Sequence, residues 1–294
     1  MKKVPTRAFV ALLLGNAALA LGPWTVRLSG VGPIAAGFWR LALALPFLWA
    51  IAVLLRQPPR VPSRGQTLAI AAAALFFAAD LALWNAGIHL TKLGNATLFG
   101  NVASFVLAGW GLWIVRRGPT RLEGWALLLA ALGTALLVAG SAELSLDHLR
   151  GDLLSIAAGL LYAGYLIGVE RVRGSMQPMP LLFLASLFGA IYLLPVALLT
   201  GEQIIPADWT GVILFALGSQ VIGQSLLVYA LGEVPPLIVG LALLTQAAVS
   251  AAIGWLYYGE VMTPLDILGA LAIGTALVLV RLQDRPAKPK SEPA

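Results

Sequence analysis

Long apolar stretches alternate with short polar joints along most of this chain. Each stretch holds about 20 mostly apolar residues, the length that an α-helix needs to cross the hydrocarbon core of a bilayer. The joints carry residues that break helices or favour water, such as Pro-Pro-Arg at 58–60. The pattern therefore predicts ten transmembrane helices, at 8–28, 33–55, 66–89, 94–115, 122–140, 151–170, 180–200, 209–231, 236–258 and 264–281.

Composition indicates that lipid is the main solvent of the chain. Of the 294 residues, 60% are hydrophobic and 11% are charged, and the mean hydropathy is +0.89. A soluble domain has about 25% charged residues, so these charges are too few to cover a surface that faces water. The sequence contains no cysteine, which excludes disulfides, thiolate metal sites and cysteine nucleophiles.

The placement of lysine and arginine predicts the orientation in the membrane. Most of the 19 basic residues fall in joints on the same side as the N-terminus, whereas acidic residues such as Glu202 and Asp208 fall on the other side. Because basic loops stay cytoplasmic, both termini should face the cytoplasm of a bacterial inner membrane, with 285–294 as a cytoplasmic tail. This pattern accounts for the net charge of +6 without nucleic acid as a partner.

The N-terminal sequence is similar to a cleavable signal peptide. Basic residues precede an apolar run, and Ala-Leu-Ala follows at 18–20. The apolar run continues well past residue 20, however, and cleavage would remove one of the ten helices. We therefore expect this segment to be retained.

A weak internal repeat divides the chain into halves. Gly-Thr-Ala-Leu at 133–136 recurs at 274–277, and the third predicted helix aligns with the eighth at nearly the same offset. Chance explains one tetrapeptide equally well, but ten spans also divide into five and five. An odd number of spans in each half inverts the second half, as in many secondary transporters. We predict an all-α integral membrane protein with two inverted five-helix repeats, at 1–145 and 146–284.

Several short motifs carry a resemblance to a known family. Gly-Pro at 32–33 and Phe-Trp-Arg at 38–40 open the second span, Tyr-Ala-Leu at 229–231 closes the eighth, and Gly-Glu at 259–260 ends the ninth. With these motifs the chain resembles the bacterial ten-helix EamA-type exporters of the drug/metabolite transporter superfamily, over essentially its whole length. The first half departs from the family pattern, since it lacks the usual proline in the fourth helix and the Gly-Glu end before the fifth. Among relatives, the exporters of aromatic amino acids look most similar.

Asp80 is the one acidic residue deep inside a predicted span. Arg40 lies at a depth that differs by less than one helical turn in the neighbouring span. In one interpretation Asp80 titrates, or attracts the amino group of a substrate. In the other, Asp80 and Arg40 form a structural ion pair that locks two helices together. Both interpretations stay open, because buried carboxylates mark transport pathways and also simply pair.

Other polar and aromatic residues lie at similar depth. Gln220 and Gln224 share a helical face, and we predict that this face lines a wet cavity, with hydrogen bonding between helices as the alternative. Phe77 and Trp84 flank Asp80 and suit a cationic or zwitterionic, partly aromatic solute, although ordinary packing explains each single ring equally well. The predicted substrate-binding residues are Asp80, Trp84, Phe77, Asn101, Tyr162, Tyr165, Gln220, Gln224 and Gln246, and the predicted structural or coupling residues are Arg40 and Asp80.

Missing motifs exclude other functions. The sequence has no P-loop, no His-Glu-x-x-His pair and no Gly-x-Ser-x-Gly elbow, which argues against an ATP-driven pump or an enzyme. A channel needs a continuous polar path, whereas the polar residues here gather near mid-depth. We predict a monomeric secondary transporter, without cofactor or metal, that exports small metabolites by alternating access. Amino acids, aromatic ones in particular, are the first substrate hypothesis; cationic aromatic drugs, or a channel function, are the alternatives.

Overall fold

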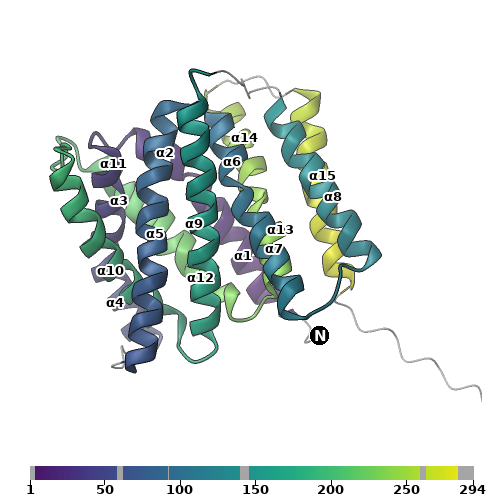
Figure 1. Ribbon diagram of the computed structural model, residues 1–294, viewed down its shortest axis with the longest axis horizontal. Coiled ribbons are helices and arrows are strands. Elements are labelled where there is room, and N and C mark those ends of the chain that lie inside the picture. The colour runs from purple at the N-terminus through teal and green to yellow at the C-terminus, as the bar shows by residue number, and fades with distance from the viewer. Residues whose placement is uncertain (1–3, 58–61, 92, 140–145, 259–262, 284–294) are drawn as a thin grey trace, which may run out of the picture.

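The computed structural model describes residues 4–57, 62–91, 93–139, 146–258 and 263–283. This part of the chain is helical, without strands, and Figure 1 shows a single bundle of roughly parallel and antiparallel helices. The helices are α1 (Thr6–Leu19), α2 (Gly22–Arg27), α3 (Pro33–Ala42), α4 (Ala44–Leu54), α5 (Arg64–Leu90), α6 (Leu93–Gly100), α7 (Val102–Ile114), α8 (Arg121–Ala139), α9 (Leu149–Arg173), α10 (Pro178–Leu199), α11 (Thr210–Phe215), the π-helix η1 (Ala216–Gln224), α12 (Ser225–Leu231), α13 (Pro236–Leu243), α14 (Thr245–Tyr258) and α15 (Pro264–Gln283).

The ten predicted spans coincide with these helices to within a few residues. Nine helical segments of the described chain are long and apolar enough to cross a membrane. The fifth predicted span corresponds to α8, which has 19 residues. The prediction of an all-α integral membrane protein is therefore confirmed. The predicted tail at 285–294 lies outside the described residues.

Half of the spans are interrupted, a feature that hydropathy does not reveal. The breaks separate α1 from α2, α3 from α4, α6 from α7 and α13 from α14, and η1 separates α11 from α12. Pro23 starts α2 at a position where proline costs no hydrogen bond. Pro195, by contrast, lies within the unbroken helix α10. At Leu43, Asn101 and Leu244 the backbone keeps right-handed helical angles, so each of these spans remains one continuous crossing.

A long loop from the second half fixes the start of α3. The Glu202 carboxylate accepts hydrogen bonds from the backbone N–H groups of Ile34 and Ala35, both at 2.9 Å. These are unpaired donors of the first helical turn, and a negative charge there also meets the positive end of the helix dipole. The Trp39 indole donates to the Ile204 carbonyl at 2.7 Å. The loop therefore ties α3, which carries Arg40, to the other half of the chain.

Glycines set the closest approach between α8 and α15, which lie side by side at the right edge of the bundle in Figure 1. A Cβ at Gly133 would lie 2.7 Å from the Gly269 carbonyl oxygen, and a Cβ at Gly269 would lie 2.6 Å from that of Gly133. Small residues permit such contacts in lipid, where helix association depends on van der Waals packing. At one end of the bundle, Arg281 of α15 lies 4.0 Å from the ring centroid of Phe9 in α1. The start of α1 and the end of α15 therefore lie on the same side.

Candidate functional site

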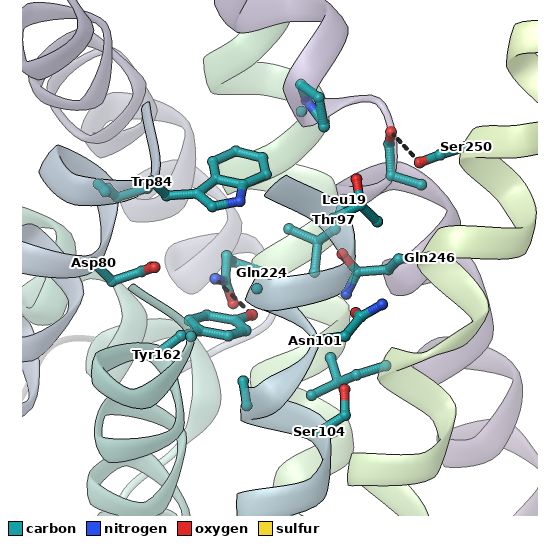
Figure 2. A pocket seen from close by; sticks show the side chains of 18 of the residues that line it. Leu19, Asp80, Trp84, Thr97, Asn101, Ser104, Tyr162, Gln224, Gln246 and Ser250 are labelled. Atoms are coloured by element: carbon teal, nitrogen blue, oxygen red, sulfur yellow. Dashed lines mark hydrogen bonds between the residues drawn. The ribbon is translucent and has the colours of Figure 1, made fainter. Parts of the chain in front are cut away.

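A cavity of about 110 Å³ lies in the interior of the bundle. Its walls come from α1, α2, α3, α5, α6, α7, α9, η1, α13 and α14, so both halves of the chain contribute. Figure 2 shows Asp80, Tyr162 and Gln224 on one side and Asn101, Gln246 and Ser250 on the other. The lining includes most of the residues predicted from sequence: Arg40, Phe77, Asp80, Trp84, Asn101, Tyr162, Gln224 and Gln246.

Two predicted residues do not line the cavity. Tyr165 is fully buried behind Phe77, and the two rings stack with centroids 4.3 Å apart. Gln220 is also fully buried, and its side chain bonds to Arg40 and Ser186. Both residues lie behind the wall and support residues that face the cavity. Of the two glutamines that were predicted to share a cavity-lining face, Gln224 lines the cavity and Gln220 supports the wall from behind.

Asp80 and Arg40 do not form a direct ion pair, although both are part of the described chain. The choice between the two interpretations of Asp80, substrate binding or a lock between two helices, stays a prediction. Both side chains are nearly buried, at 8% and 5% exposure, and both line the cavity. Their charges still interact at longer range. Within the described residues, no side chain donates a hydrogen bond to the Asp80 carboxylate, whose oxygen points into the cavity in Figure 2.

Arg40 is held by one amide and two aromatic rings. Its Nε donates to Oε1 of Gln220 at 3.0 Å. Its guanidinium carbon lies 5.4 Å from the ring centroid of Phe77 and 5.0 Å from that of Phe215. Cation–π attraction of this kind partly compensates a buried cation for its lost water. The terminal nitrogens of Arg40 form no hydrogen bond within the described chain, and they are not sealed off from the cavity.

Aromatic rings form a second part of the wall. Phe77 lies 6.3 Å from Tyr162 and stacks on Tyr165, so that α5 and α9 share one aromatic cluster. Trp84 lies further along α5 and presents its indole nitrogen towards Gly100, where an added Cβ would lie 3.4 Å from it. A solute in the cavity would therefore meet charge and aromatic surface together.

Amide side chains from two spans, those of Gln224 and Asn101, complete the site. Nε2 of Gln224 donates to the Tyr162 hydroxyl at 3.3 Å, and its buried Oε1 has no partner. The buried Nδ2 of Asn101, at the break between α6 and α7, has none either. Buried polar atoms without partners are rare in folded proteins and often mark a ligand or water site. Both atoms belong to side chains that line the cavity.

Sequence reasoning missed several polar residues of the site. Ser104, Thr97 and Ser250 line the cavity. Ser250 donates to the Ala20 carbonyl at 3.2 Å, next to the break between α1 and α2. Hydroxyl side chains are common in transmembrane helices, so only their position relative to the cavity distinguishes them. No cluster of three or more metal-ligating side chains occurs in the described residues.

Comparison with known proteins adds an independent observation. The model of the EamA-like transporter family matches this sequence twice, at residues 6–139 and at 149–282. The chain belongs to the EamA-like transporter family. It is therefore a multi-pass membrane transporter and not an enzyme.

Two curated transporters share sequence with this EamA-like protein. It is 29% identical over 179 residues to an "Uncharacterized transporter" of Archaeoglobus fulgidus, which covers 60% of this chain and 61% of the relative. It is also 29% identical over 152 residues to the threonine/homoserine exporter RhtA of Escherichia coli, covering 50% of each chain. The alignments thus span about half to three fifths of the relatives' length.

A solved structure shares the fold of this transporter. A protein crystal structure with 15% sequence identity superposes with a TM-score of 0.73, covering 95% of this chain and 96% of the other. At this identity the match concerns the fold alone. It extends over nearly the whole chain.

Proposed function

We propose that this transporter exports zwitterionic amino acids by alternating access, and that the cavity around Asp80 and Arg40 is the substrate site. The observation that carries the proposal is a carboxylate and a guanidinium that line one small cavity without pairing directly. An amino acid carries an ammonium and a carboxylate on the same carbon atom, so it complements both groups at once. The carboxylate of Asp80 would accept from the ammonium, and Arg40 would donate to the carboxylate.

The size and the polarity of the cavity support a small substrate. A volume of about 110 Å³ is small beside the about 300–1,000 Å³ of drug-sized ligand pockets. This favours an amino acid over the larger cationic drugs. The amide side chains of Gln224 and Asn101 at the cavity wall would suit a side-chain hydroxyl.

Two classes of amino acid remain candidates. The relative named a threonine/homoserine exporter supports small hydroxyl-bearing substrates. The rings of Phe77, Trp84 and Tyr162 at the cavity wall support the aromatic substrates expected from sequence. The small cavity makes threonine and homoserine our first choice and phenylalanine and tryptophan our second.

The division of the chain supports alternating access. In the fourth span, α6 and α7 are separated at Asn101, and in the ninth, α13 and α14 are separated at Leu244. Both breaks adjoin cavity residues from opposite halves. A central site lined by both halves of the chain is typical of inverted-repeat transporters, whose halves rock around it. We further propose a monomer in the bacterial inner membrane with both termini in the cytoplasm, on the basis of the basic joints.

A transport assay tests this proposal. The purified protein is reconstituted in proteoliposomes, and the uptake of radiolabelled threonine, homoserine, phenylalanine and tryptophan is measured with and without a pH gradient. We expect saturable uptake of at least one of these amino acids, and we expect Asp80→Asn to weaken it. Uptake equal to that of protein-free liposomes for all four would refute amino-acid transport.

A further inference from the structure

A buried amide behind the cavity wall controls the charged group that faces the substrate. We infer that Gln220 is a positioning residue that holds Arg40 in the orientation needed to receive a substrate carboxylate. The inference rests on the proposed function, because it assigns one half of the zwitterion to Arg40. Gln220 itself does not line the cavity.

The hydrogen bonds around Gln220 fix which way its amide points. Its Nε2 donates to the Ser186 hydroxyl at 2.9 Å, and its Oε1 accepts from Nε of Arg40 at 3.0 Å. A guanidinium only donates, so the reversed amide would set two donors against each other. Ser186 and Gln220 are fully buried, without water to replace these bonds. The arrangement therefore has one satisfied orientation.

The hydrogen bond from Nε of Arg40 to Gln220 leaves the two terminal nitrogens of the guanidinium available to the cavity. Arginine binds carboxylates through two parallel N–H groups. When Nε is held by Gln220, the terminal nitrogens are the donors that remain for the cavity. They have no other hydrogen-bond partner among the described residues. The amide thus directs the guanidinium rather than competing with the substrate.

The π-helix η1 explains why one helix can hold Arg40 from two directions. In an α-helix, residues five apart point about 140° away from each other. A π-helix closes its hydrogen bonds over five residues, which brings such residues towards the same side. Phe215 directly precedes η1, and Gln220, five residues after Phe215, lies within η1. Both residues contact Arg40. The rare helix type therefore serves the placement of this one cation.

The test compares threonine with 1-amino-2-propanol, which is threonine without its carboxylate. In proteoliposomes, Gln220→Leu should raise the half-saturation concentration of threonine about tenfold or more, as expected for loss of one charge-assisted contact. The inhibition constant of 1-amino-2-propanol against threonine uptake should change less than about twofold, since the amine does not use Arg40. A merely structural role of Gln220 would shift both values together.

Two further variants keep the test decisive if Gln220→Leu folds poorly. Gln220→Glu keeps the size and the acceptor oxygens but neutralises Arg40, so it should weaken threonine selectively. Ser155→Ala is the control, because Ser155 is equally buried but bonds only to the Gly151 carbonyl in its own helix. Equal effects on both solutes, or unchanged threonine affinity in Gln220→Glu, would overturn the inference. Failure of the unsubstituted protein to transport any of the four amino acids would instead refute the proposed function.

Discussion

The repeated Gly-Thr-Ala-Leu sequence provides a sharp test of how the helices pack. Gly133 in α8 lies against α15, where a Cβ would lie 2.7 Å from the Gly269 carbonyl oxygen, well short of the 3.4 Å at which ordinary contact begins. Gly274, its counterpart in the second half, has no atom within 4 Å of such a Cβ. The same substitution, glycine to alanine, should therefore have opposite effects at the two positions.

The magnitude follows from two contributions. Replacing glycine by alanine within a helix stabilises it by about 0.5–1 kcal/mol. This gain applies to both sites and cancels in the comparison. Overpacking at Gly133 costs about 1–3 kcal/mol, because the helix backbone cannot move away as a flexible side chain would. Gly133→Ala should therefore be less stable than Gly274→Ala by about 1–3 kcal/mol.

Unfolding of each purified variant in mixed micelles, with increasing SDS and tryptophan fluorescence as the signal, measures this difference. The transition should shift to lower SDS for Gly133→Ala and stay unchanged or rise for Gly274→Ala. Variants Gly269→Ala and Gly109→Ala repeat the comparison, since Gly269 faces Gly133 closely and Gly109 has open space. Equal transitions for Gly133→Ala and Gly274→Ala would refute the close packing of α8 and α15.

Further predictions concern the cavity and the helix start that supports it. Asp80→Asn should raise the half-saturation concentration of the transported amino acid about tenfold or more, by loss of a charge-assisted hydrogen bond; an unchanged value and pH profile would leave Asp80 without a role in binding. Glu202→Ala should destabilise the protein by about 0.5–2 kcal/mol in SDS unfolding, as loss of a helix cap does. Glu202→Gln, which keeps an acceptor oxygen, should cost less, and equal costs would contradict capping of α3. Deletion of Gly218, which has open space around it, should convert η1 to an α-helix and weaken threonine uptake, with far-UV circular dichroism as the control for folding; uptake that matches the unaltered protein would argue against a role for the π-helix.

The spans were predictable because their cause is local. About 20 apolar residues in a row suffice to predict a membrane helix, and the helix bounds in the structure follow the apolar stretches closely. The start of α5 is local as well. Ser63 accepts from the Gln66 N–H, and Gln66 accepts from the Ser63 N–H, which is a capping box visible in the sequence.

Features that depend on distant parts of the chain were not predictable. The start of α3 depends on Glu202, which is 168 residues away from Ile34. A glutamate in a loop is common and does not by itself indicate a helix cap. Only the tertiary fold brings the Glu202 carboxylate to the start of α3. The π-helix η1 is likewise not visible in the apolar pattern of the sequence.

The candidate site was predictable in part for the same reason. Asp80 and Gln224 stand out as polar residues within apolar stretches, and both line the cavity. Helical periodicity places Gln220 beside Gln224, but it does not reveal that Arg40 approaches Gln220 from another helix. Arg40 and Asp80 lie at similar depth, yet Arg40 bonds to Gln220 and not to Asp80. Equal depth in the membrane was therefore insufficient to predict which groups bond.

The most direct test of the whole account is a counterflow measurement. Proteoliposomes loaded with a high concentration of unlabelled threonine are diluted into a trace of labelled threonine. A carrier with one site open to alternate sides must accumulate the label transiently above its outside concentration. Because Asp80→Asn weakens binding, it should reduce the overshoot at the same loading concentration without removing it. A label that only equilibrates in the unsubstituted protein, at a rate proportional to concentration without saturation, would contradict a carrier with its site at this cavity.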